Sequence, residues 1–188
     1  MTSNTIPAAC FALPFLLLTA SEAHAQAMAC ADLTAIVESA HADFAPIRGP
    51  LQSSIMPGAS PLPHAPSTRF EVHLHATTRP LAGAGSCKIR LMQKEDTSAA
   101  LREATYHCDW PAGPGFAAMR QSVKSCLMNA EMREETADSL RLYIEHDASG
   151  DGERSVHVSV EAGRAKAAKL SITRTVCIGR AAGGCGKR

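Results

Sequence analysis

Hydrophobic and polar residues alternate in the middle of the chain in a way that predicts two adjacent antiparallel strands. Residues 87–91 and 104–110 both alternate with a period of two. When Cys87 is set opposite Cys108, the apolar side chains of both segments gather on one face and the polar side chains on the other. Because a shift of one residue would mix the two sets, this is the register that we expect.

Helical periodicity predicts one helix before this hairpin and one after it. Asp32 is placed to cap a helix whose apolar stripe ends at Phe44, and Pro46 follows shortly afterwards. A second apolar stripe begins at Phe116, and we expect this helix to continue towards residue 137. Residues 45–68 contain six prolines and no periodic pattern, which predicts a long loop.

Four further alternating segments complete the predicted sheet, namely residues 70–77, 140–144, 156–160 and 170–173. Residues 147–153 are rich in Asp, Gly and Ser, which predicts a hairpin between the second and third of these segments. The order is then α-βββ-α-βββ. Because the strands follow one another through short links, the fold class predicted is α+β with an antiparallel sheet.

This order of elements resembles the chaperone-like α+β fold of type III secretion chaperones. The resemblance rests on the order of helices and strands alone and implies no functional residue. A cystatin-like sheet curled around one helix is the alternative architecture.

The first 25 residues are typical of a signal peptide, so we expect a single domain over residues 26–188. Residues 8–18 are apolar, no charge precedes Glu22, and Ala23-His24-Ala25 is a small-x-small cleavage site. Residues 25–27 offer a second cleavage site. The apolar run is too short to span a bilayer. We therefore expect an exported protein, periplasmic or extracellular, without a transmembrane segment.

The cysteines predict a covalent framework. Removal of the signal peptide takes one of the seven cysteines away, and an even number in an exported protein predicts three disulfides among 15 possible pairings. The hairpin register favours a bridge between Cys87 and Cys108. No C-x-x-C spacing points to redox or metal chemistry instead.

Two more bridges follow from the remaining positions. Cys177 and Cys185 flank a Gly-rich segment that could close into a short loop. Cys30 is then left with Cys126, and this bridge would tie the first helix to the second. The connectivity beyond the central hairpin stays open at this point.

The charge of the mature chain is nearly balanced, with 19 basic and 17 acidic residues. Such a balance does not indicate nucleic-acid binding. The C-terminal part is basic, because no acid follows Glu161 and residues 178–188 form a basic, Gly-rich tail. A tail of this kind is usually solvated, although it could contact anionic material. A structural component of the cell envelope is therefore one alternative function.

Three histidines give the strongest candidate for a polar binding surface. His73 and His75 alternate along one predicted strand, and His107 stands on another. An H-x-H pair with a distant histidine is one way to build a zinc site. Lys88 and Arg90 are expected between them, however, and two cations beside a metal ion are unfavourable. We therefore expect a polar, pH-responsive face rather than a metal centre.

A weaker metal candidate lies in the predicted turn, where Asp147, Ser149 and Asp151 match the first half of a calcium-binding loop. The twelfth position of such a loop should be a bidentate Glu, but here it is Val158. A hairpin turn rich in Asp, Gly and Ser accounts for the same residues.

The sequence contains no motif for nucleophilic catalysis, no carboxylate pair typical of glycosidases and no phosphate-binding loop. We therefore expect no catalytic residue and no cofactor, and a binding protein, inhibitor- or chaperone-like, whose partner is a protein or envelope component. Its expected surface consists of His73, His75, Lys88, Arg90 and His107. The alternative is a metal-binding protein or enzyme that uses the three histidines.

Overall fold

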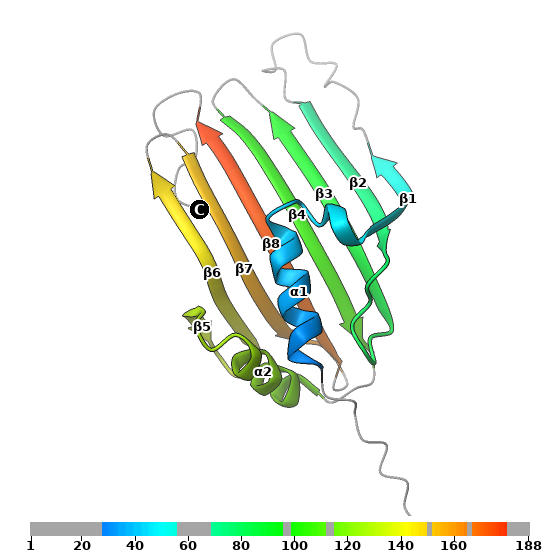
Figure 1. Ribbon diagram of the computed structural model, residues 1–188, viewed down its shortest axis with the longest axis vertical. Coiled ribbons are helices and arrows are strands. Elements are labelled where there is room, and N and C mark those ends of the chain that lie inside the picture. The colour runs from blue at the N-terminus through cyan, green and yellow to red at the C-terminus, as the bar shows by residue number, and fades with distance from the viewer. Residues whose placement is uncertain are drawn as a thin grey trace, which may run out of the picture.

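The protein is built on one antiparallel sheet of eight strands (Figure 1). The computed structural model describes residues 28–55, 69–95, 99–111, 115–149, 152–164 and 167–179. The predicted signal peptide and most of the predicted basic tail therefore lie outside the described residues.

The chain consists of two halves with the same order of elements, and each half is a helix followed by four strands. The first half contains α1 (Cys30–Ala40), a short 3-10 turn (Ala45–Ile47), β1 (Arg48–Ile55), β2 (Arg69–Thr77), β3 (Ser86–Glu95) and β4 (Ala99–Trp110). The second half contains α2 (Gly115–Cys126), β5 (Glu131–Glu135), β6 (Ser139–Ser149), β7 (Gly152–Ala162) and β8 (Ala168–Gly179). The strands lie in the order β1-β2-β3-β4-β8-β7-β6-β5, so the last strands of the two halves pair in the centre.

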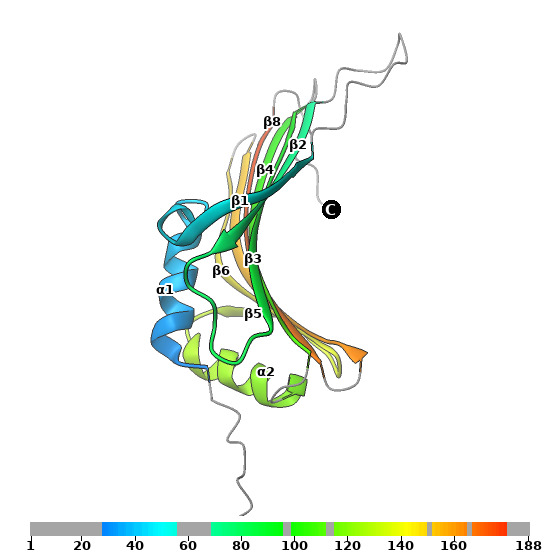
Figure 2. The same ribbon diagram turned by 90° about the vertical axis from the view of Figure 1, so that its right-hand side faces the viewer.

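Both described helices lie on the same face of the sheet, and this face carries the core (Figure 2). Leu33 and Ile36 of α1 are fully buried, as are Tyr106 of β4 and Ile172 of β8. Each such aliphatic side chain contributes about 1.5–3 kcal/mol when it is removed from water. Alternation along the long central strands thus determines which face the helices cover.

Two disulfides support this core. Cys30 at the start of α1 is bonded to Cys126 at the end of α2, with 4.9 Å between their Cα atoms. Cys87 is bonded to the directly opposed Cys108, with 4.2 Å between the Cα atoms. These are the two longer-range pairings expected from the sequence. Cys177 is also disulfide-bonded, but Cys185 lies outside the described residues, so that pairing stays a prediction.

The fold class is mostly β rather than α+β, because the sheet has two strands that we did not predict. Strand β1 occupies residues 48–55, within the segment predicted as a loop. It pairs with β2 through two irregular steps in register and is exposed over most of its length. An edge strand of this kind buries neither face, so its sequence shows no alternation.

The other unpredicted strand, β5, replaces the expected end of the second helix. Helix α2 ends at Cys126, and residues 131–135 pair with β6. The sequence Glu-Met-Arg-Glu-Glu favours a helix by intrinsic propensity. Tertiary pairing with a long neighbouring strand overrides that weak local preference. The remaining predicted strands, including the β6–β7 hairpin, are present.

Candidate functional site

The face of the sheet opposite α1 and α2 is the candidate functional surface, and we call it the open face. Along the strands the sheet bends away from the helices, so the open face is concave in this direction (Figure 2). Thr105 and Thr173 meet at its centre with 3.3 Å between their hydroxyl oxygens. Their side chains and that of Ser155 are buried, although no described helix covers them. The open face therefore presents a close-packed polar floor.

The structure divides the five residues predicted to form one binding surface. Lys88 pairs with His107, and Arg90 pairs with Thr105, so these side chains share the open face. His73 pairs with Leu91 and His75 with Ile89, which belong to the helix-bearing face. The prediction of one surface with all three histidines is therefore wrong.

The link between β2 and β3, residues 78–85, explains this placement. Leu81 in the link is buried, the hydroxyl of Tyr106 donates a hydrogen bond to the Arg79 carbonyl, and Trp110 Nε1 donates one to the Ala82 carbonyl. These contacts fix where β2 ends and where β3 begins. The helices do not contact β2 appreciably, so its own alternation does not decide which face it buries.

The two displaced histidines make local contacts beside the β1 edge. His73 Nδ1 lies 3.1 Å from the hydroxyl of Ser54, and its Nε2 lies 3.8 Å from the carboxylate of Glu71. His75 Nδ1 lies 3.3 Å from the Gly49 carbonyl. Each histidine is thus held by a different neighbour, and neither approaches His107.

His107 on the open face lies in a hydrogen-bonded chain. Its Nδ1 is 3.0 Å from the hydroxyl of Ser171, and its Nε2 is 3.1 Å from both carboxylate oxygens of Asp109. Burial lowers the pKa of His107, and the nearby Asp109 opposes that shift. The imidazole is held in one orientation between a hydroxyl and a carboxylate.

The hydrogen-bonded residues Ser171, His107 and Asp109 are of the types that serve as nucleophile, base and acid, but no oxyanion site lies beside them. Strands β4 and β8 pair without interruption over twelve residues, and Ser171 lies within this ladder. The backbone N–H groups of this ladder are used in sheet hydrogen bonds, so none is aimed at a reacting carbonyl beside Ser171. The arrangement therefore suits recognition of a ligand better than acyl transfer.

A second cluster occupies the open face of β6 and β7. The rings of Tyr143 and His157 stack with 5.5 Å between their centroids, and His146 meets Tyr143 edge-on at 5.6 Å. Arg133 lies over the ring of Tyr143 at 5.3 Å. His157 Nδ1 is buried and has no hydrogen-bond partner. Burial, followed by the charge of Arg141, lowers the pKa of His157, while Glu103 opposes the shift.

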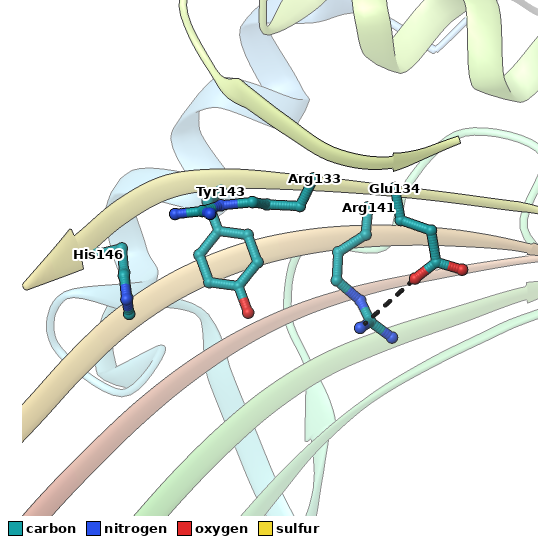
Figure 3. A pocket seen from close by; sticks show the side chains of 5 residues that line it. All are labelled: Arg133, Glu134, Arg141, Tyr143 and His146. Atoms are coloured by element: carbon teal, nitrogen blue, oxygen red, sulfur yellow. Dashed lines mark ion pairs between the residues drawn. The ribbon is translucent and has the colours of Figure 1, made fainter. Parts of the chain in front are cut away.

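A shallow pocket of about 230 Å³ opens beside this cluster (Figure 3). It is lined by Arg133, Glu134, Arg141, Tyr143 and His146. The side chains of Arg141 and Glu134 point towards each other, and their charged groups lie 3.6 Å apart. Arg133 is 3.2 Å from Glu131 at the rim. Two guanidinium groups and one imidazole thus surround a space large enough for a small ligand group.

This pocket was not predicted, although the sequence contains a signal for it. Leu140 and Leu142 alternate with Arg141 and Tyr143, so the polar pair had to lie opposite the core. The sequence does not indicate β5, because its pattern predicts the end of a helix at Arg133 and Glu134. Without that strand, the two arginines could not be brought together.

The candidate metal sites are not assembled among the described residues. His107 is separated from His73 and His75 by the sheet, and no group of three potential metal ligands is found in this part of the chain. Asp147 and Ser149 belong to β6, whereas Asp151 lies outside the described residues. Ser149 pairs with Gly152, which agrees with the hairpin predicted here.

Comparisons with known proteins provide no functional assignment: no family model, curated protein or solved structure matches the chain. None of the described helices is both long enough and apolar enough to cross a membrane.

Acidification should destabilise the protein through His157 and His107. Both pKa values are lowered in the native state. Below the unfolded value of about 6.5, the unfolded chain therefore binds more protons than the native protein, and stability falls as the pH is lowered.

The variant His157→Phe tests this expectation, because it keeps a ring against Tyr143 but removes the titrating group. We expect the melting temperature of this variant to fall less than that of wild type between about pH 7.5 and pH 5.5. Equal falls would contradict the role given to His157.

Proposed function

We propose that this protein is an exported binding protein that recognises a protein partner through the open face. The observation that supports this proposal best is the division of the sheet into two faces. Both described helices cover one face, while the other is concave and carries ordered polar and charged side chains. The two disulfides are compatible with an oxidising compartment.

The dimensions of the open face suit a macromolecule. Eight strands at about 4.8 Å spacing give a width of roughly 34 Å, and strands of 11 or 12 residues give a length of roughly 36–40 Å. This face is larger than the roughly 800 Å² that one partner contributes to a typical protein complex. A small molecule would cover only a fraction of it.

The composition of the open face also suits a protein interface. Met92 packs with the buried Leu101 and Cys177 in a small second apolar cluster on this side of the sheet. Val72 pairs with Met92, and the exposed Ile55 pairs with Val72, so the apolar area continues to the β1 edge. Arg90, which forms an ion pair with Glu103, borders this area. Protein interfaces commonly combine an apolar patch with arginine and tyrosine side chains, and Tyr143 of β6 lies on the same open face.

Photo-crosslinking in the producing organism tests this proposal. A benzophenone amino acid at Ser159 would report on the open face, and one at the exposed Gln121 of α2 would report on the helix-bearing face. We expect Ser159 to yield one defined crosslinked protein, identified by mass spectrometry, and Gln121 not to yield it.

A blocking variant makes the test specific. Thr175→Arg places a long cation on the open face and should abolish the crosslink from Ser159, whereas Gln121→Arg should leave it unchanged. Both variants must melt near the wild-type temperature. A crosslink that is equally strong from Gln121, or that survives Thr175→Arg, would overturn the proposal.

A further inference from the structure

We propose that the pocket lined by Arg133, Arg141, Tyr143 and His146 binds a carboxylate of an acidic segment in the protein partner. This inference rests on the function proposed above and names the chemistry by which the partner is recognised. The pocket lies on the open face at the β5–β6 edge, where a bound segment could continue across the sheet.

The charges in the pocket favour an anion. Two guanidinium groups face one carboxylate, that of Glu134, within the lining. Glu131 at the rim lies 3.2 Å from Arg133, and because both side chains are exposed, an incoming carboxylate can replace it as it can replace Glu134. The guanidinium of Arg133 is oriented over the ring of Tyr143, and Tyr143 is in turn stacked on His157. Packing of this kind limits the conformations of Arg133 before any ligand binds, which lowers the entropy cost of binding. The pocket is therefore partly preorganised.

Arg141 can bind a ligand carboxylate if that carboxylate replaces Glu134, the present ion-pair partner of Arg141. Arg141 lies 3.6 Å from Glu134, and both side chains are more than two-fifths exposed. Exposed ion pairs of this kind contribute only about 0–1 kcal/mol. An incoming carboxylate that accepts two parallel hydrogen bonds from the planar guanidinium could therefore replace Glu134. Glu134 acts in this scheme as a competitor built into the chain.

The size of the pocket points to a side chain or chain end rather than to a large ligand. Its volume of about 230 Å³ is below the roughly 300–1,000 Å³ of typical cofactor and drug sites. A carboxylate with two or three methylene groups fits this space, while the rest of the segment lies on the open face. The edge-on contact between His146 and Tyr143 closes one side.

Titration with a synthetic peptide tests the inference directly. The probe is an acetylated, amidated hexapeptide rich in Glu, and the control is the same peptide with Gln in place of Glu. Imidazole resonances of His146 and His157 are followed by NMR in the intact protein. We expect the acidic peptide to shift both and the neutral peptide to bind at least tenfold more weakly.

Glu134 and Glu135 are neighbours on opposite faces of β5, so their variants provide a matched test and control. Arg141→Gln should weaken binding of the acidic peptide at least fivefold, whereas Glu134→Gln should strengthen it two- to fivefold by removing the competitor. Glu135→Gln, on the helix-bearing side of the same strand, removes a partner of Lys124 and should leave the affinity unchanged.

Three results would overturn the inference: equal binding of the neutral peptide, unchanged affinity in Arg141→Gln, or tighter binding in Glu135→Gln than in Glu134→Gln. Inorganic phosphate binding more tightly than the acidic peptide would also overturn the choice of a peptide carboxylate. If the peptide fails while the crosslink from Ser159 persists, only this inference fails. If that crosslink is absent, the proposed function itself fails.

Discussion

Loss of the bridge between Cys30 and Cys126 is expected to lower the free energy of unfolding more than loss of the bridge between Cys87 and Cys108. The first bridge spans 96 residues of sequence and the second spans 21. In the chain-entropy model these loops correspond to about 4.7 and about 3 kcal/mol. The shorter bridge also joins strands whose register the sheet hydrogen bonds already fix, so part of its constraint is duplicated.

The position of the longer bridge adds to this difference. It links α1 covalently to the second half of the chain, and it joins the start of α1 to the end of α2. Without it, α1 is still held by its buried apolar residues and by the ion pair between Asp43, just after the helix, and Arg174 of β8. We therefore expect a folded but less stable protein.

The comparison requires replacements that fit each site. Cys30→Ser with Cys126→Ala suits the more exposed bridge, whereas Cys87→Ala with Cys108→Val fills the space left by the buried sulfur. For a domain of this size, the loss of the longer bridge should lower the melting temperature by about 10–20 °C. A fall of only one or two degrees, with a larger fall for the Cys87 and Cys108 variant, would contradict the expectation.

The central part of the fold could be predicted because several local signals agree there. Strands β3 and β4 have alternating side chains and opposed cysteines, and only one register gathers the apolar side chains of both strands on one face. The hairpin of β6 and β7 combines alternation with turn residues. Where a strand is buried on one face and joined by a short turn, its own residues determine its pairing.

The edges could not be predicted, because their conformation depends on neighbours. Strands β1 and β5 lie at the two ends of the sheet, so neither has the one-sided burial that produces alternation. The two histidines of β2 were placed on the wrong face for the same reason. There the link at residues 78–85 sets the register, and that link folds through contacts with distant residues.

The candidate site depends on the same non-local information. The positions of Arg141 and Tyr143 opposite the core follow from alternation alone. The pocket forms only when β5 adds Arg133 and Glu134 beside them, and β5 has the composition of a helix. His146 joins Tyr143 on the open face only because of the irregular step in the pairing of β6 with β7 that follows Tyr143. Alternation therefore predicted the face on which Arg141 and Tyr143 lie, but not the contacts between strands.

Removal of the Tyr106 ring should be the most damaging single change in the core. Tyr106 is fully buried at the centre of β4, and its ring lies 6.0 Å from that of Phe44, centroid to centroid. Burial raises the pKa of its hydroxyl well above the ordinary value, so the group remains a neutral hydrogen-bond donor. Truncation to Ala should cost about 3–5 kcal/mol, because it removes the apolar ring and leaves a cavity.

The matched variant Tyr106→Phe separates the ring from the hydroxyl. It keeps the packing against Phe44 but leaves the Arg79 carbonyl without its donor, which lies 2.9 Å away in the native protein. The expected loss is about 0.5–1.5 kcal/mol, the net contribution of a typical intramolecular hydrogen bond. Because this hydrogen bond holds the link at residues 78–85, its amides should exchange with solvent faster, while those of the β7 strand stay protected. Urea unfolding gives the two free energies, and hydrogen exchange locates the change. Equal stability of Tyr106→Phe and wild type, with unchanged exchange in the link, would show that the hydroxyl does not hold it.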